Sequence, residues 1–252
     1  MCLILKIVAA AVFIKLVHGI KGIPGRAYTK CSKYDDDLDE CLVKLVDDIR
    51  PYLISGVPKI GFPQLEPFLM ESVPIDVSVP GLTLKGVATN VATTGSSNFR
   101  IDNFKINYDD STAEFTLLIP KLEVKADFVV NGTKVLFFSV EATGKFEGTF
   151  ENLLSTIKVR GRLDDETEFG GEVFLRIPYT NIKVTFGSTH YKITPKHSTL
   201  KTIVASNLIN YSPKSPVLFM LKSRINTIAA QLVKKYVNSV LENIPLKDIL
   251  KD

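Results

Sequence analysis

The sequence predicts an α+β fold in which a long, curved antiparallel sheet packs along a long C-terminal helix, with a short helix near the N-terminus. Three observations predict it. Apolar residues recur at helical spacing over residues 38–53, alternate with period two for about 120 residues, and return to helical spacing from about residue 199. No repeat or linker divides the chain, so we expect a single domain over residues 20–252.

The first 19 residues are typical of a secretory signal peptide. An apolar run from Ile7 to Ile14 lies between Lys6 and Lys15 and is too short to cross a bilayer. Compact residues follow at Val17–Gly19, where cleavage would occur. The alternative is a buried N-terminal helix, which the lack of a polar face disfavours. We therefore expect residues 1–19 to be removed and the mature protein to be secreted and extracellular.

The N-terminal helix carries the second of two cysteines that remain after this cleavage. Cys2 leaves with the signal peptide, and Cys31 and Cys41 form an even pair that an oxidising compartment allows to join. We predict that they form the only disulfide, which would stabilise the protein by roughly 3 kcal/mol. The acidic residues at 35–40 complement the positive end of the helix dipole, and without a loop glycine they do not suit calcium. The predicted buried face comprises Leu38, Cys41, Leu42, Leu45, Val46, Ile49 and Leu53.

The alternating region contains one change of phase. Odd-numbered apolar residues from Ala113 to Ile119 give way after Pro120 to even-numbered ones from Leu122 to Val130, which predicts a bulge in one long strand. Asn131-Gly132 then predicts a two-residue hairpin turn. The return strand is apolar at Leu136, Phe138, Val140, Ala142, Phe146 and Phe150, with Gly144 and Gly148 on the same face. Glycines there suit a strongly curved sheet, or a close neighbour. Later strands carry Ile157, Val159 and Leu163, then Val173, Leu175, Ile177 and Tyr179, then Ile182, Val184 and Phe186.

The last helix is predicted to begin at Ser215-Pro216 and to run to about Asn243. At about 1.5 Å per residue it is a rod near 40 Å long, and only the sheet is long enough to cover it. Its apolar stripe comprises Leu218, Leu221, Ile225, Ile228, Leu232, Tyr236, Val240 and Ile244, widened by Ala229, Val233, Val237 and Leu241.

Four features of residues 31–67 together resemble the insect takeout and juvenile-hormone-binding protein family. They are the cysteine pair around an acidic helix start, Arg50-Pro51-Tyr52-Leu53, Gly56-Val57-Pro58 and Leu65-Glu66-Pro67. The resemblance continues more weakly to the C-terminus. It implies a small member of the tubular lipid-binding superfamily, with one highly curved antiparallel sheet wrapped around a long C-terminal helix and a hydrophobic cavity between them.

The resemblance implies a secreted carrier of a juvenile hormone-like terpenoid, a fatty acid or a related lipid. The alternative is a dry core filled by the same apolar side chains. The chain lacks the cysteines for the second disulfide of haemolymph hormone carriers, and it has no tryptophan. It therefore looks more like the takeout branch. The candidate ligand-binding residues are Phe99, Ile101, Phe104, Leu117, Ile119, Phe128, Phe138, Phe146, Leu175, Phe186, Phe219 and Ile225.

Little in the sequence suggests catalysis, so we do not expect an enzyme. His190 and His197 lie in a predicted strand end and loop, and Gly95-Ser96-Ser97 lacks the closing glycine of a nucleophile elbow. No spaced pair of histidines or cysteines predicts a metal site, and no phosphate loop or dinucleotide motif predicts a cofactor. Removing Lys6 and Lys15 reduces the net charge from +4 to +2, which argues against a nucleic-acid partner.

Two other functions compete with the carrier. A lipid-surface protein of the bactericidal/permeability-increasing type needs a clustered basic tip, and no basic run beyond Lys234-Lys235 is evident. A secreted hydrolase is a remote third because a catalytic set is missing. We expect a monomer without stable membrane insertion, and the sequence names no receptor. Sequons at Asn131 and Asn210 suit a secretory route, although Pro213 disfavours the second.

Overall fold

The computed structural model describes residues 37–58, 62–79, 82–107, 110–135, 138–166, 172–197, 199–210 and 216–241. The predicted signal peptide and Cys31 lie outside these residues. The elements in chain order are helix α2 (Leu38–Ser55), strands β1 (Phe68–Val79) and β2 (Leu82–Thr94), the 3-10 turn η2 (Ser96–Asn98), strands β3 (Arg100–Asn107), β4 (Thr112–Val135), β5 (Phe138–Glu166), β6 (Glu172–Thr185) and β7 (Thr189–Pro195), and helices α3 (Leu200–Asn210) and α4 (Pro216–Leu241).

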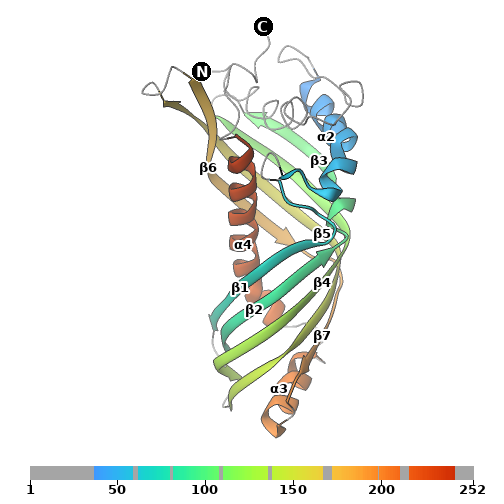
Figure 1. Ribbon diagram of the computed structural model, residues 1–252, viewed down its shortest axis with the longest axis vertical. Coiled ribbons are helices and arrows are strands. Elements are labelled where there is room, and N and C mark those ends of the chain that lie inside the picture. The colour runs from blue at the N-terminus through green and yellow to red at the C-terminus, as the bar shows by residue number, and fades with distance from the viewer. Residues whose placement is uncertain are drawn as a thin grey trace.

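The strands form one antiparallel sheet built around two long strands, β4 and β5 (Figure 1). In one half of the sheet, β4 pairs with β3 and β5 pairs with β6; in the other half, β4 pairs with β2 and β5 pairs with β7. Strand β1 pairs with β2 and forms an edge. The long antiparallel sheet predicted from the alternating pattern is therefore confirmed.

The change of partners occurs where the sequence changes phase. Strand β4 runs through Pro120 for 24 residues without a break, as predicted. Ile119 pairs with Leu153 and Lys121 with Glu151, so that Pro120 faces Asn152, whose φ of 50° is left-handed. The register of β4 with β5 is unshifted across this position, so the pairing does not contain the predicted bulge there, and the phase changes in both strands together. Apolar side chains from both halves of each strand nevertheless join one cluster.

Two further details of the predicted strands are wrong. Asn131-Gly132 is not the hairpin turn: β4 continues to Val135, and the dipeptide lies where the pairing with β5 shifts between Val130 and Thr133. The same dipeptide suits a bulge as well as a turn. The two strands predicted between residues 173 and 186 are one strand, β6. Its register shifts near Tyr179, which is therefore 48% exposed rather than turned inward.

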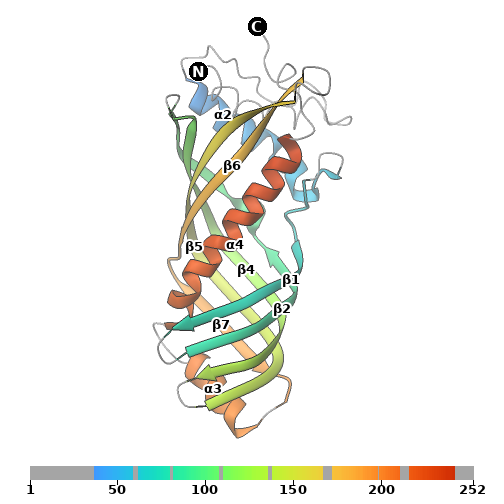
Figure 2. The same cartoon turned by 90° about the vertical axis from the view of Figure 1, so that its left-hand side faces the viewer.

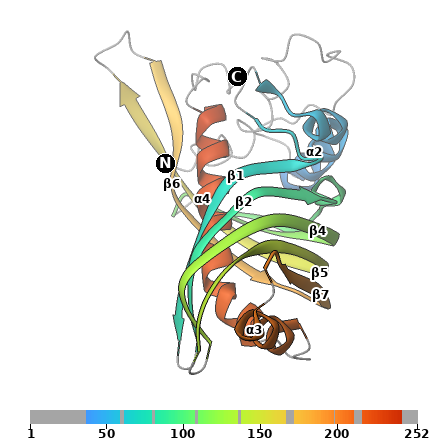
Figure 3. The same ribbon diagram turned by 60° about the horizontal axis from the view of Figure 1, so that its bottom comes forward.

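Helix α4 lies across the open side of the sheet between strands β6 and β1 (Figure 2). It packs along β6 and reaches β1, where the rings of Phe68 and Tyr236 meet edge to face with centroids 5.9 Å apart. Viewed from the lower end, the strands curve past the helix (Figure 3). The described apolar side chains of α4 are half-buried, so the helix is less deeply covered than its sequence predicts.

Asparagine side chains form hydrogen bonds with backbone groups at free edges of the sheet. The Asn238 side chain accepts from the backbone N–H of Ile177 at 2.7 Å and donates to its carbonyl oxygen at 3.0 Å. Asn226 accepts from the N–H of Val184 at 2.9 Å. Asn210, at the end of α3, makes the same pair of bonds with Ile193 of β7, at 2.9 and 3.1 Å. An asparagine amide thus takes the place of a neighbouring strand, which protects these edges from pairing with another chain.

Candidate ligand-binding interior

The interior between the sheet and α4 is one apolar cluster. Its buried members are Val46, Leu53, Val57, Phe99, Ala113, Phe150, Leu153, Ile157, Val159, Ile177, Ile182 and Val184. Around them lie apolar side chains that are only partly buried, namely Phe62, Leu65, Ile101, Phe104, Phe115, Leu117, Ile119, Leu122, Val124, Phe146, Phe186, Ile225, Ala229, Ala230, Val233 and Val237. The cluster extends across both halves of the sheet, from Ala113 and Ile157 in one half to Val124 and Phe146 in the other.

Most of the predicted ligand-binding residues lie in this cluster. Phe99 is buried in it, and Ile101, Phe104, Leu117, Ile119, Phe146, Phe186 and Ile225 pack against it. Phe128 is half-buried, with its ring beside Gly144. The side chains of Phe138, Leu175 and Phe219 lie outside the described part of the structure.

The predicted ligand-binding residues omit two kinds of interior residue. The first continues the strand alternation that had already been recognised, at positions such as Phe115, Phe150 and Leu153. The second is a set of small side chains on α4, including Ala229, Ala230 and Val233. The strands that face these residues supply larger side chains, such as Phe115 and Phe150, so the large side chains of the interior come mostly from the sheet.

Aromatic side chains pack in pairs along the sheet. Phe104 stacks on Phe115 with centroids 5.6 Å apart, and Phe150 meets Phe186 at 5.3 Å. A Cβ added to Gly148 would lie 2.9 Å from the ring of Phe146. The close neighbour predicted for this inner-face glycine is thus one of the protein's own rings.

Two motifs that carry the family resemblance form a polar junction around η2, beside Lys121 near the middle of β4. Arg50 of α2 donates from one guanidinium nitrogen to the backbone carbonyl oxygens of Ser97, at 2.9 Å, and of Phe99. Its guanidinium carbon lies 4.3 Å from the centroid of the Phe99 ring. The Glu66 carboxylate accepts from the backbone N–H groups of Gly95 and Ser97 at 3.0 and 2.8 Å. The motifs that contain Arg50 and Glu66 therefore both hold η2, which lies about 30 to 50 residues further along the chain.

Glycines make this junction possible. Gly56 ends α2 with φ of 76°, and a Cβ there would lie 2.4 Å from the backbone nitrogen of Gln64. Gly95 has φ of 90°, and a Cβ there would lie 2.2 Å from the carbonyl oxygen of Lys121. Larger residues would force these segments apart. The Gly-Val-Pro motif is thus a structural requirement.

Glu66 makes the junction sensitive to acid. Partial burial raises the pKa of its carboxyl, but hydrogen bonds from Ser97 and Gly95 outweigh burial, and the pKa lies below its ordinary value of 4.5. The resulting stabilisation is present above pH 4.5 and is lost as the pH falls through the folded-state value. We expect Glu66→Gln to be less stable at neutral pH and to lose less stability on acidification. Parallel denaturant curves at several pH values would measure this; equal pH dependence in both proteins would contradict it.

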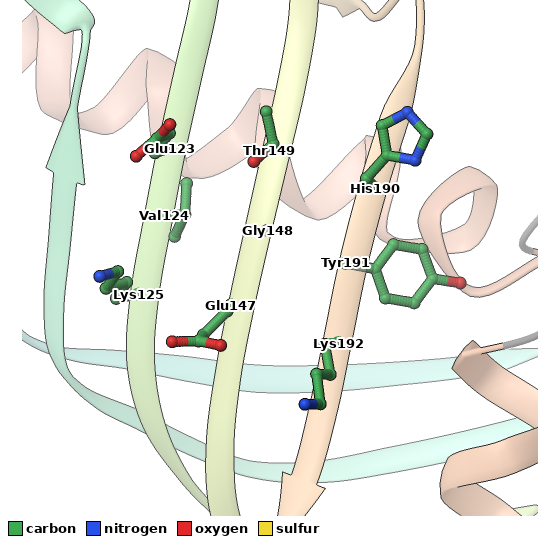
Figure 4. A pocket seen from close by; sticks show the side chains of 9 residues that line it. All are labelled: Glu123, Val124, Lys125, Glu147, Gly148, Thr149, His190, Tyr191 and Lys192. Carbon is green, nitrogen blue, oxygen red and sulfur yellow. The ribbon is translucent and has the colours of Figure 1, made fainter.

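Two pockets of the described chain are shallow, and Val124 alone among their lining residues belongs to the apolar cluster. One, of about 280 Å³, lies over β4, β5 and β7 and carries Glu123, Lys125, Glu147, His190 and Lys192 (Figure 4). The other, of about 240 Å³, lies beside α3 and carries Glu141 and His197. The charged side chains at both pockets do not suit an apolar ligand.

The two described histidines and the possible metal ligands lie apart from the apolar interior or scattered over the chain. His190 and His197 are both exposed, on β7 and just after it. Within the ranges that the structure covers, no three histidine, cysteine or acidic side chains gather as metal ligands. Nor does any described helix have the length and apolar character needed to cross a bilayer.

Comparison with known proteins places the chain among proteins of related fold. A family model described as haemolymph juvenile hormone binding protein matches residues 7–251. The crystal structure of Takeout 1 from Epiphyas postvittana superposes with a TM-score of 0.66, covering 83% of this chain and 94% of that one at 15% identity. A lipopolysaccharide binding protein gives a TM-score of 0.38, covering 79% of this chain and 37% of that one at 10% identity. A search of curated proteins found no match. The likeness to Takeout 1 shows a shared fold.

Proposed function

Because the chain belongs to the haemolymph juvenile hormone binding protein family, we propose that it is a secreted carrier that holds one small apolar molecule between the sheet and α4. The candidate cargo is a juvenile hormone-like terpenoid, a fatty acid or a related lipid. The sheet would wrap around α4 to enclose the cargo, and no covalent chemistry is involved. We propose that the protein is not an enzyme, because its two described histidines are exposed and the family that it belongs to is one of binding proteins.

The observation that carries this proposal is the partial burial of large apolar side chains along the inner face. Phe104, Phe115, Leu117, Ile119, Phe146 and Phe186 pack against the core without being fully covered. In a dry core, such side chains are closely packed from all sides. An apolar ligand would complete their burial, and the small side chains of Ala229 and Ala230 would leave room for it.

Affinity would come from burial of apolar area. At about 25 cal/mol per Å², a ligand burying about 300 Å² gains about 7 kcal/mol before entropy losses. Micromolar or weaker binding follows without a strong polar contact. Selectivity should then depend on the length and shape of the ligand more than on its functional group.

The variant Ala229→Phe distinguishes an interior with space for a ligand from a dry core filled by side chains. If the space is open, we expect the variant to keep its melting temperature and to bind about tenfold more weakly, because the ring occupies ligand volume. A dry core would instead be overpacked and lose about 1–3 kcal/mol of stability. Displacement of a fluorescent fatty acid by terpenoids and acyl chains measures binding, and Leu69→Ala, on an exposed residue of β1, is the control. A destabilised Ala229→Phe together with no displacement in the parent protein would contradict the carrier.

A secretory route accounts for the modifications that we propose. Cys41 is disulfide-bonded in the structure, and its partner lies outside the described residues, so the pairing with Cys31 stays a prediction. Asn131 is exposed and open to a glycan, whereas the side-chain nitrogen of Asn210 donates to Ile193. Peptide mapping of the unreduced secreted protein should find a linked Cys31–Cys41 peptide, a glycan at Asn131 and none at Asn210. Free thiol at Cys31 would refute the pairing.

A further inference from the structure

In the first two turns of helix α3 the apolar and polar faces are reversed relative to an ordinary surface helix. The buried side chains described there are Thr202, Ala205 and Ser206, at 5%, 7% and 8% exposure. Three large apolar side chains of the same turns point outward: Leu200 is 79% exposed, Ile203 43% and Val204 39%. These three occupy positions i, i+3 and i+4 and so form one stripe.

This stripe is held in place at both ends of the helix. At the start, Thr199 N–H donates to the hydroxyl of Thr202 at 2.8 Å, and Thr202 N–H donates to the hydroxyl of Thr199 at 3.2 Å. At the end, the Asn210 side chain bonds both backbone groups of Ile193 in β7. The exposed stripe is therefore part of a capped, anchored helix and does not arise from fraying.

Helix α3 also stands at one tip of the molecule. Figures 1 and 2 show it at the lower end, beyond the strands and far from α2. In a soluble protein, a contiguous exposed apolar stripe at such a place marks an interaction surface.

The charged residues nearest to α3 in the sequence are basic. Lys196 and Lys201 are exposed on either side of the start of α3, with His197 between them in sequence. Glu141 is an exposed carboxylate in the pocket that His197, Thr199 and Thr202 line beside the helix. The sequence from Val173 to Leu241 contains ten lysines and arginines and no aspartate or glutamate. They are Arg176, Lys183, Lys192, Lys196, Lys201, Lys214, Lys222, Arg224, Lys234 and Lys235.

We propose that α3 docks the protein onto the surface of an anionic lipid bilayer, with Leu200, Ile203 and Val204 entering the interfacial region and Lys196 and Lys201 meeting the headgroups. An exposed apolar stripe beside basic residues is the arrangement that binds such surfaces. A second copy of the chain fits less well, because pairing through the stripe would bring the lysines of both copies together. The proposal is independent of whether the interior holds cargo.

Vesicle sedimentation with the full mature protein tests this inference. We expect binding to phosphatidylcholine vesicles that contain phosphatidylserine, weaker binding to phosphatidylcholine alone, and loss of binding at high salt. The pair Leu200→Gln and Ile203→Gln, and separately the pair Lys196→Glu and Lys201→Glu, should each weaken binding about tenfold or more. Leu69→Gln and Lys183→Glu are the controls, since both residues are exposed and lie on β1 and β6.

The melting temperature and fatty-acid displacement should be unchanged in both double variants, because the substituted side chains are exposed. Sedimentation of the parent protein with neither vesicle type would overturn the proposal. So would unchanged binding in both double variants. A concentration-dependent dimer that dissociates on Leu200→Gln and Ile203→Gln would also overturn it and assign the stripe to self-association.

Discussion

Asn238→Ala is expected to lower the free energy of unfolding by about 3 kcal/mol. The Asn238 side chain is bonded to both backbone groups of Ile177, which is itself 2% exposed. Removing the amide leaves a buried N–H and a buried carbonyl without partners, and it frees an edge of β6 for pairing with other chains. Urea denaturation followed by circular dichroism measures the loss, and light scattering measures the expected aggregation.

Asn226→Ala is the matched control on the same helix. Asn226 is half-buried and accepts one hydrogen bond from β6, so its loss should cost about 1 kcal/mol. Equal losses in the two variants would mean that the number of edge hydrogen bonds does not decide their contribution.

Arg50→Ala should lower the free energy of unfolding by about 2–3 kcal/mol. The guanidinium group bonds two backbone carbonyl oxygens around η2 and lies over the Phe99 ring. Its loss removes a connection between α2 and the turn before β3. Arg50→Lys should recover only part of the loss, because an ammonium lacks the planar face that lies over the Phe99 ring. Denaturant curves of both variants give the comparison.

Asp47→Ala tests whether the ion pair of Arg50 matters in itself. Asp47 is 58% exposed, and an exposed pair of this kind contributes at most about 1 kcal/mol. We expect nearly parental stability. A loss as large as that of Arg50→Ala would show that the effect of Arg50 comes from the pair and not from the backbone carbonyls.

The larger elements could be predicted from the sequence because each depends on a local pattern. The phase change at Pro120 predicts one long strand with a bulge; β4 runs through Pro120 unbroken, but its register with β5 does not shift there. The Ser215-Pro216 start predicts the final helix, and α4 begins at Pro216. A period of two or of 3.6 residues is visible in any short window, which is why these assignments hold.

Features that depend on distant partners were not predictable. Asn226 and Asn238 look like ordinary polar residues of a helix, and only the fold brings them to the edge of β6. The turn after β4 was misplaced because Asn-Gly favours a bulge as well as a hairpin. Which apolar residues remain partly exposed depends on how far α4 stands from the sheet, and that distance is not encoded in the alternation of either element.

The net charge of the chain does not reveal how unevenly its acidic residues are distributed along the sequence. The small net charge hides the stretch from Val173 to Leu241, which has no acidic residue, and a search for long basic runs misses it because the lysines are scattered. The exposed stripe of α3 was hidden for another reason. Apolar residues at helical spacing suggest burial, yet here Thr202 and Ser206 take the buried positions.

Native mass spectrometry of the protein purified from its own source tests the central claim most directly. The carrier predicts a complex heavier than the mature chain and its modifications by one small lipid or terpenoid, released on extraction with organic solvent and restored on incubation with the extract. Ala229→Phe should retain less of this mass. A protein that carries no extractable apolar molecule, and takes up none when offered terpenoids and fatty acids, would contradict the account.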